Sequence, residues 1–296
     1  MTESRGAKVL TLRVLNCLVR ISCPAPGLLD LLAQAYGSMH CNNGVGADLE
    51  YLVDGNTERG VRISRAGCAP LLANSDGEFL FLFEKDLTIQ LQRLRRDLYF
   101  LHAAAVELAG RTSLLVGASG QGKSTTAWGL LHHGFGYLSD ELGPVCLRTM
   151  RVFAYPHSLC LKSEPPPPYP LPPEVLRTSQ TLHVPALSLP GPTVSGSSPI
   201  AAVFFLERRT AEQAPMLAAI SSGEGTARLF AQALNPLAHR EDGLHGAITI
   251  AREAYCFRLL LGDLRCTCDL LADTLSRLPA DRRSLNTTTC QGASIS

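Results

Sequence analysis

Residues 117–124 read Gly-Ala-Ser-Gly-Gln-Gly-Lys-Ser and fit the pattern G-x-x-x-x-G-K-[ST] in full. Glycines let a loop turn tightly, so several backbone N–H groups can converge on a phosphate, and a following helix adds the positive end of its dipole. A lysine such as Lys123 would then reach the β- and γ-phosphates, and the Ser124 hydroxyl would bind Mg²⁺. The predicted nucleotide-binding residues are Gly117, Ala118, Ser119, Gly120, Gln121, Gly122, Lys123, Ser124 and Thr125.

A pair of acidic residues, Asp140 and Glu141, follows this loop after one helix and one short strand. Side chains alternate along a strand, so two adjacent carboxylates cannot both point the same way. One of them can hold Mg²⁺ while the other faces elsewhere, or both can belong to a solvated turn. We assign Asp140 to the metal-and-base position, and the predicted magnesium ligands are Ser124, Asp140 and Glu141.

His102 stands upstream of the loop, at the start of the strand predicted over residues 103–108. A histidine at a strand end near an acidic pair could orient or tune a carboxylate base. A structural histidine is the alternative reading, and the sequence leaves both open. The predicted catalytic residues are Asp140, His102 and Lys123.

The elements around these residues are those that a phosphate-binding loop needs. Apolar strands are predicted over 103–108 and 112–116, the second of which runs directly into the loop, and a helix over 125–132 precedes a strand over 136–138. A further buried strand is predicted over 201–206. It is followed by Arg208 and Arg209, which are either additional phosphate-neutralising cations or a solvated strand end.

The N-terminal part of the chain has a different pattern, which predicts a small α+β unit. We expect a strand over 9–19, a helix over 28–35, short strands over 48–83 with hairpin turns at 54–56 and 76–77, and an amphipathic helix over 85–97. The proline-rich segment 164–173 is expected to be an extended surface loop, with a substrate-facing lid as the alternative. Residues 185–199 are expected to be loop, and residues 227–234 and 272–278 to be helical. The predicted domains are 1–84, 85–282 and a disordered tail over 283–296.

Composition excludes several classes of protein. The chain has 296 residues, of which 46% are hydrophobic, enough to fill a core. Because 27 Lys and Arg residues balance 26 Asp and Glu residues, there is no cationic field for a nucleic acid or an anionic membrane. No apolar run approaches the ~20 residues of a membrane span, so we expect neither nucleic-acid nor membrane partners.

The ten cysteines predict neither disulfides nor a metal site. The N-terminus has no apolar stretch of the secretory type, so we expect a cytoplasmic protein with reduced thiols. The cysteines are scattered along the chain, and Cys266 and Cys268 have one intervening residue, whereas a zinc knuckle has two to four.

The runs 101–106, 117–124 and 134–141 together resemble the catalytic domain of HPr kinase/phosphorylase and of related kinases in peptide-modification gene clusters, including those that phosphorylate lasso-peptide precursors. The resemblance implies a phosphoenolpyruvate-carboxykinase-like P-loop nucleotide-binding fold with a mixed sheet, in the α/β (α+β) class. It also implies that Asp140 is the base toward an acceptor serine, that His102 stands beside it, and that ATP and Mg²⁺ are the cofactors. The second acidic residue is Glu141 where HPr kinases have aspartate, and the segment that supports HPr docking and dephosphorylation is not found.

From these observations we expect an ATP-dependent kinase that acts on a hydroxyl, such as that of serine, in a peptide or small-protein acceptor. The alternatives are a small-molecule kinase, a plain ATPase, or a non-catalytic nucleotide-binding regulatory module. The resemblance also implies that the chain can assemble into a homo-oligomer.

Overall fold

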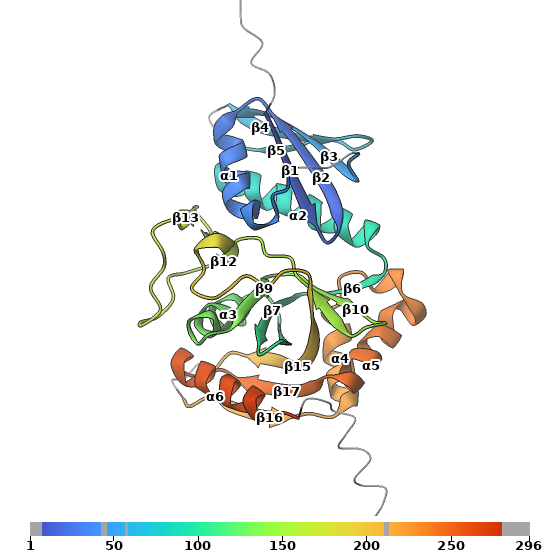
Figure 1. The fold of residues 1–296 in the computed structure, drawn as a ribbon, viewed down its shortest axis with the longest axis vertical. Helices are drawn as coiled ribbons and strands as arrows, with labels where there is room; N and C mark the ends of the chain where they lie inside the picture. Colours follow the sequence, from blue (N-terminus) through green and yellow to red (C-terminus); the bar gives the residue numbers. More distant parts are fainter. Residues whose placement is uncertain (1–7, 43–45, 57–58, 210–212, 280–296) are drawn as a thin grey trace, which may run out of the picture. The chain divides into compact units, whose positions relative to one another are not determined.

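The computed structural model describes residues 8–42, 46–56, 59–209 and 213–279. The chain divides into two compact units (Figure 1). Unit 1 comprises Met1–Arg96 and Tyr155–Leu189, and unit 2 comprises Asp97–Ala154 and Pro190–Ser296. Both units combine α-helices with β-sheets, and each contains a sheet with parallel and antiparallel pairs, which confirms the expected α/β class with mixed sheets.

The first sheet of unit 1 has the order β1-β2-β3-β4-β5, in which β2 and β3 are parallel and the other neighbours antiparallel. In β3, burial alternates residue by residue from Leu49 to Asp54, so one face of this strand is buried. The elements of this part are β1 Lys8–Val14, β2 Cys17–Cys23, α1 Pro26–Tyr36, η1 Gly37–Met39, β3 Leu49–Asn56, β4 Gly60–Arg65, β5 Leu71–Ala73 and α2 Asp76–Leu94.

The single strand predicted over 9–19 is wrong, because the chain reverses there into the β1–β2 hairpin. Leu15 and Asn16 have φ angles of 47° and 65° and form the turn. Two consecutive left-handed residues match the right-handed twist of the paired strands, and asparagine tolerates this conformation better than most residues. With neither glycine nor proline in the turn, the reversal was hidden inside a continuous apolar pattern.

The hairpin predicted at 76–77 is also wrong, since Asp76 begins helix α2. The Ser75 hydroxyl accepts a hydrogen bond from the Glu78 backbone N–H at 3.2 Å, which caps the helix. The helix predicted over 85–97 corresponds to the second half of α2, which ends at Leu94. The domain boundary predicted at 84/85 therefore falls inside a helix, whereas unit 1 extends to Arg96.

Unit 1 is completed by a distant stretch of the chain. An antiparallel sheet has the order β12-β14-β13, formed by β12 Leu159–Leu161, β13 Leu176–Arg177 and β14 Leu182–Val184, with the short helix η2 Ala186–Ser188 after it. Residues 164–173 contain neither helix nor strand, as their prolines predicted. The assignment of 155–189 to unit 1 differs from the predicted domain 85–282. The predicted tail 283–296 lies outside the described residues.

The sheet of unit 2 has the order β6-β10-β11-β15-β8-β7-β9, and β17 and β16 continue it from β15. The segment 185–199, expected to be loop throughout, contains η2 and the start of β15. The strands are β6 Leu98–Leu101, β7 Ala103–Leu108, β8 Arg111–Val116, β9 Gly136–Ser139, β10 Gly143–Cys146, β11 Arg151–Phe153, β15 Ser197–Glu207, β16 Met216–Ala219 and β17 Tyr255–Leu260.

The direction of these strands decides where functional residues can meet. Strand β15 is parallel to β8 and to β17, and β7 is antiparallel to both β8 and β9. The carboxyl ends of β8, β9, β15 and β17 therefore lie at one edge of the sheet, together with the start of β7. Ligands of open α/β sheets bind beyond the carboxyl ends of the strands.

Helices cover both faces of this sheet. On one face, α4 and α5 contribute Leu229 and Ile250 to a core that includes Val203 and Phe205 of β15. Helix α3 contacts β7, β8, β9 and α6 on the other face. The bounds are α3 Lys123–His132, α4 Ser222–Phe230, η3 Pro236–Ala238, η4 Arg240–Gly243, α5 Leu244–Glu253 and α6 Leu264–Arg277. The helix predicted over 272–278 begins earlier than expected, and the helix predicted over 227–234 is wrong beyond Phe230, where α4 ends.

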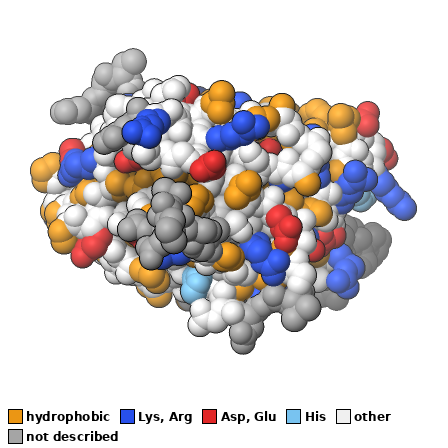
Figure 2. Space-filling view, turned by 90° about the horizontal axis from the view of Figure 1, so that it is seen from above, with side chains coloured by type: hydrophobic (Ala, Val, Ile, Leu, Met, Phe, Trp, Pro, Cys, Tyr) orange, Lys and Arg blue, Asp and Glu red, His pale blue; other side chains and the backbone are white. Residues whose placement is uncertain are grey.

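The surface carries charges of both signs, and the helices differ in length and hydrophobicity. Basic and acidic side chains are interspersed over the face seen in Figure 2, without a large area of one sign. Within the described residues, no helix combines the length and the apolar character required to cross a bilayer.

Candidate functional site

The glycine-rich loop connects β8 to α3, as the motif predicted. Gly120 and Gly122 have φ angles of 84° and 93°, a region that side-chain-bearing residues rarely adopt. Gly122 is also the N-cap of α3, so the backbone turns sharply and then enters the helix at Lys123. The first N–H groups of a helix have no partner within it, which gives this loop the donors that a phosphate requires.

The side chain of Lys123 contacts the loop that precedes this residue. Its Nζ donates to the carbonyl oxygens of Gly117 at 2.8 Å and Ala118 at 3.3 Å. The residue is only 4% exposed, so these contacts hold its ammonium group inside the loop. A group with three donors on a flexible stem can exchange carbonyl oxygens for phosphate oxygens.

Ser124 and Asp140, predicted to act together, are in contact. The Ser124 hydroxyl donates to Oδ1 of Asp140 at 3.1 Å. Ser124 stands in the first turn of α3 and Asp140 directly follows β9, so the contact joins the loop helix to the edge strand. Asp140 is fully buried, and a buried carboxylate needs such partners because burial without them is costly.

His102 and Glu141 form a second pair, with Nε2 of the histidine 2.7 Å from Oε2 of the glutamate. The backbone N–H of His102 donates to the Gln232 carbonyl oxygen at 2.9 Å. This hydrogen bond fixes the backbone of His102, the residue that precedes β7. Glu141 has a φ of 63°. The carboxylates of Asp140 and Glu141 face different partners, as predicted. The cause is the left-handed backbone at Glu141, whereas the prediction attributed the separation to side-chain alternation along a strand.

The structure thus brings the predicted site residues to one edge in two adjacent pairs. Asp140 contacts Ser124 of the loop, and Glu141 contacts His102. The contact of Glu141 with the histidine differs from its predicted use as a magnesium ligand, which stays a prediction. A carboxylate bonded to imidazole Nε2 orients the ring.

A contact that sequence reasoning missed ties the loop to β15. Oε1 of Gln121 accepts a hydrogen bond from the backbone N–H of Arg208 at 2.8 Å. A Cβ added to Gly117 would come within 3.2 Å of the Leu206 carbonyl oxygen and 3.3 Å of Gln121 Cβ, so the loop lies directly against the end of β15. Gln121 occupies an unrestricted position of the motif, so only the topology could reveal this contact.

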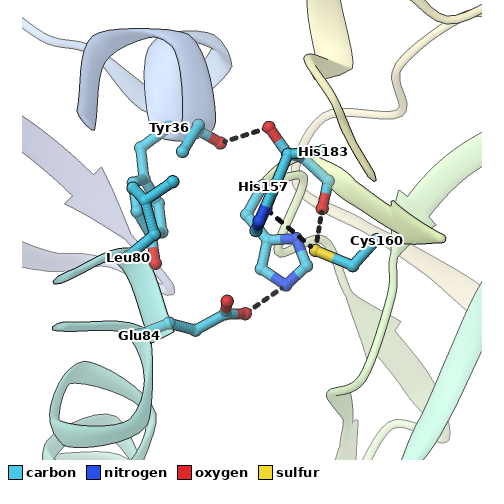
Figure 3. A pocket seen from close by; sticks show the side chains of 8 residues that line it. Tyr36, Leu80, Glu84, His157, Cys160 and His183 are labelled. Atoms are coloured by element: carbon cyan, nitrogen blue, oxygen red, sulfur yellow. Dashed lines mark hydrogen bonds and ion pairs between the residues drawn. The ribbon is translucent and has the colours of Figure 1, made fainter. Parts of the chain in front are cut away.

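Unit 1 contains a polar cavity of its own, shown in Figure 3. Nε2 of His157 lies 2.7 Å from Oε1 of Glu84, and Sγ of Cys160 lies 3.4 Å from Nδ1 of His183. Burial lowers the pKa of His183, as does the charge of His157, while Glu84 acts against them. The cavity is small, with room for roughly one water molecule. Six of the residues that line it are Tyr36, Leu80, Glu84, His157, Cys160 and His183.

The loop and its neighbours suit a nucleotide with Mg²⁺. Mg²⁺ prefers oxygen ligands and is held in phosphate sites by one or two protein groups together with phosphates. Ser124 and Asp140 offer two such oxygens in contact with each other. Within the described ranges, no group of three or more His, Cys, Asp or Glu residues is placed to hold a metal ion.

Comparison with known proteins adds little to this geometry. No family model matches the sequence, and no curated protein matches it significantly. Among solved structures, the chain is similar to the Hpr(Ser) kinase/phosphatase from Coxiella burnetii, with 13% sequence identity over 60% of this chain and 93% of that chain. The TM-score is 0.28, so this likeness carries no argument, and the functional inference rests on the site.

Proposed function

We propose that the chain is an ATP- and Mg²⁺-dependent phosphotransferase that transfers the γ-phosphate to a hydroxyl, such as that of serine, in a peptide or small protein. The observation that carries this proposal is the 3.1 Å contact between Ser124 and Asp140 at the end of a complete phosphate-binding motif. The phosphoenolpyruvate-carboxykinase-like variant of the fold and the cytoplasmic location belong to the same proposal.

Each residue has a distinct task in this reaction. The bound ATP–Mg²⁺ supplies the transferable phosphoryl group and part of the neutralising charge. The loop amides and Lys123 would bind and orient the phosphates, and Ser124 and Asp140 would hold the metal. Asp140 accepts the proton that the acceptor hydroxyl loses. The pair formed by His102 and Glu141 orients Asp140, the residue before Glu141.

A non-catalytic regulatory module would use the same loop and the same metal ligands, Asp140 among them. A protein that only senses nucleotide needs the loop and the metal ligands, but it does not need a base. The second candidate, a small-molecule kinase or an ATPase, uses the same residues, so only the acceptor distinguishes it.

The test uses the full chain, Mg²⁺ and γ-labelled ATP with a synthetic peptide library randomised around a central serine, while free phosphate is measured in parallel. We expect label in peptides, its loss in Lys123→Met, and no change in Lys85→Met. Lys85 is a matched control because it lies on α2, with its ammonium 5.9 Å from the Phe81 ring centroid and outside the motif.

Three outcomes separate the alternatives. Free phosphate without labelled peptide, lost in Lys123→Met, indicates an ATPase and contradicts the peptide kinase. Binding of ATP without turnover into either product indicates a regulatory module. Equal nucleotide binding by wild type and Lys123→Met contradicts the assignment of the loop itself.

A further inference from the structure

Strand β15 brings two arginines, Arg208 and Arg209, to the edge where the phosphate loop lies. Because β15 is parallel to β8, with Phe205 opposite Val116, the residues after β15 lie beside the residues after β8. The residues after β8 are the phosphate loop. The sequence could not say which arginine serves the loop.

The alternation of side chains along β15 separates the two. Val203 and Phe205 belong to the core under α4 and α5, and Glu207 on the same face contacts Arg228 of α4 at 2.8 Å. Strand β15 ends at Glu207; extended to the next residue, the same alternation predicts that Arg208 faces the opposite side, where the loop helix α3 packs.

Three neighbouring arginines are already engaged. Glu207 holds Arg228 and Arg258 at 2.8 and 2.7 Å, and hydrogen bonds from both, Arg258 first, lower the pKa of Glu207. Arg209 contacts the sulfur of Met216 at 3.4 Å. These contacts hold Arg228 and Arg258 against the end of β15 and direct Arg209 to β16.

The guanidinium of Arg208 makes no hydrogen bond or ion pair with any residue in the described part of the chain, and Arg208 is exposed. Its backbone, by contrast, is fixed to the loop through Gln121. The cationic side chain of Arg208 is thus attached to a backbone whose position relative to the phosphate loop is fixed. Guanidinium groups bind phosphate oxygens in a bidentate manner, which suits them to such a position.

Resting on the proposed function, we propose that Arg208 contacts the terminal phosphate of the nucleotide, with Gln121 as the positioning residue that holds it in register with the loop. The site then distinguishes a triphosphate from a diphosphate, because only the triphosphate extends to Arg208. Arg209, whose side chain contacts Met216, has no part in this recognition.

The test measures the dissociation constants of fluorescent N-methylanthraniloyl-ATP and -ADP with the full chain. We expect Arg208→Ala to weaken ATP analogue binding about tenfold or more and ADP analogue binding less than about threefold, as for loss of one charge-assisted contact. Arg208→Lys should recover part of the loss, and Gln121→Leu should lie between Arg208→Ala and the wild type. Arg209→Ala, the matched control, should bind both analogues as the wild type does.

The outcomes distinguish this inference from the proposed function. If the wild type binds the ATP analogue and Lys123→Met does not, the loop assignment stands. Equal affinity of Arg208→Ala and wild type, equal weakening of both analogues, or an identical loss in Arg209→Ala then overturns the role of Arg208 alone. If the wild type binds neither analogue, the proposed function and the inference that rests on it are both overturned.

Discussion

Replacement of Asp140 by asparagine tests the proposed chemistry most directly. The side chain is fully buried, and its Oδ1 accepts from Ser124 at 3.1 Å. Asparagine has nearly the same shape and keeps an oxygen for this contact, but it cannot accept a proton from a hydroxyl. A positioned general base contributes about 10²- to 10⁴-fold to a rate, equivalent to about 2.7–5.4 kcal/mol of barrier at 1.36 kcal/mol per tenfold change. We expect Asp140→Asn to lower phosphoryl transfer by this factor.

The fold should tolerate the same change. Asp140→Asn removes a buried charge without changing volume, so we expect the melting temperature to shift by no more than about 4 °C, which corresponds to roughly 1 kcal/mol for a domain of this size. The assay compares label transfer, binding of the ATP analogue in EDTA, and thermal unfolding. Transfer at the wild-type rate would refute the assignment of the base. If Asp140→Asn unfolds, its loss of activity says nothing about the base. Asp140→Glu, which keeps the carboxylate, then tests the assignment: label transfer by this variant supports Asp140 as the base, and its absence in a folded variant contradicts it.

Three further predictions concern the loop, the last helix and pH. Gly122→Ala should cost about 1–2 kcal/mol of unfolding free energy and abolish nucleotide binding, because φ is 93° and the new Cβ would lie 2.9 Å from Leu261 Cδ1; Gly134→Ala, at a φ of 83° with no described atom within 4 Å, should keep nucleotide binding in the same urea and fluorescence measurements. Arg111→Ala should destabilise unit 2 by about 1–2 kcal/mol in urea unfolding, because the guanidinium donates to the carbonyl oxygens of Leu275, Leu278 and Pro279 at the end of α6; an unchanged midpoint would contradict this. Because burial lowers the pKa of His183, the unfolded state takes up a proton near pH 6.5 that the folded state resists, so stability should fall as pH falls below about 6.5, by at most about 1.4 kcal/mol per pH unit. His183→Gln should reduce this slope between pH 8 and 5.5, and an equal slope in both proteins would count against the cause.

The sequence predicted the elements around the site better than those of unit 1. The strand, loop and helix from Thr112 to His132 were recognisable because glycines and a helix start are local signals. The sequence did not indicate the reversal at Asn16, because this turn lacks glycine. It also did not indicate the helix start at Ser75, because the Asp-Gly pair that follows is typical of a hairpin. The return of residues 155–189 to unit 1 depends on contacts between segments far apart in sequence, such as the hydrogen bond from Ser158 N–H to the Ala35 carbonyl oxygen at 2.8 Å. No local pattern encodes such a contact.

The same contrast explains which site residues could be foreseen. Lys123 and Ser124 belong to one motif, and their spacing along the chain is their spacing in the loop. Asp140 and His102 were found by their proximity to that motif in sequence, but what brings them to it is strand direction: β9 ends, and β7 begins, at the edge where β8 ends. Arg208 reaches the same edge from a strand much later in the chain, through a parallel pairing that sequence alone does not specify. Residues that a motif carries can therefore be placed from the chain alone, whereas Asp140, His102 and Arg208 can be named as candidates from the chain but are placed at the edge only by the topology.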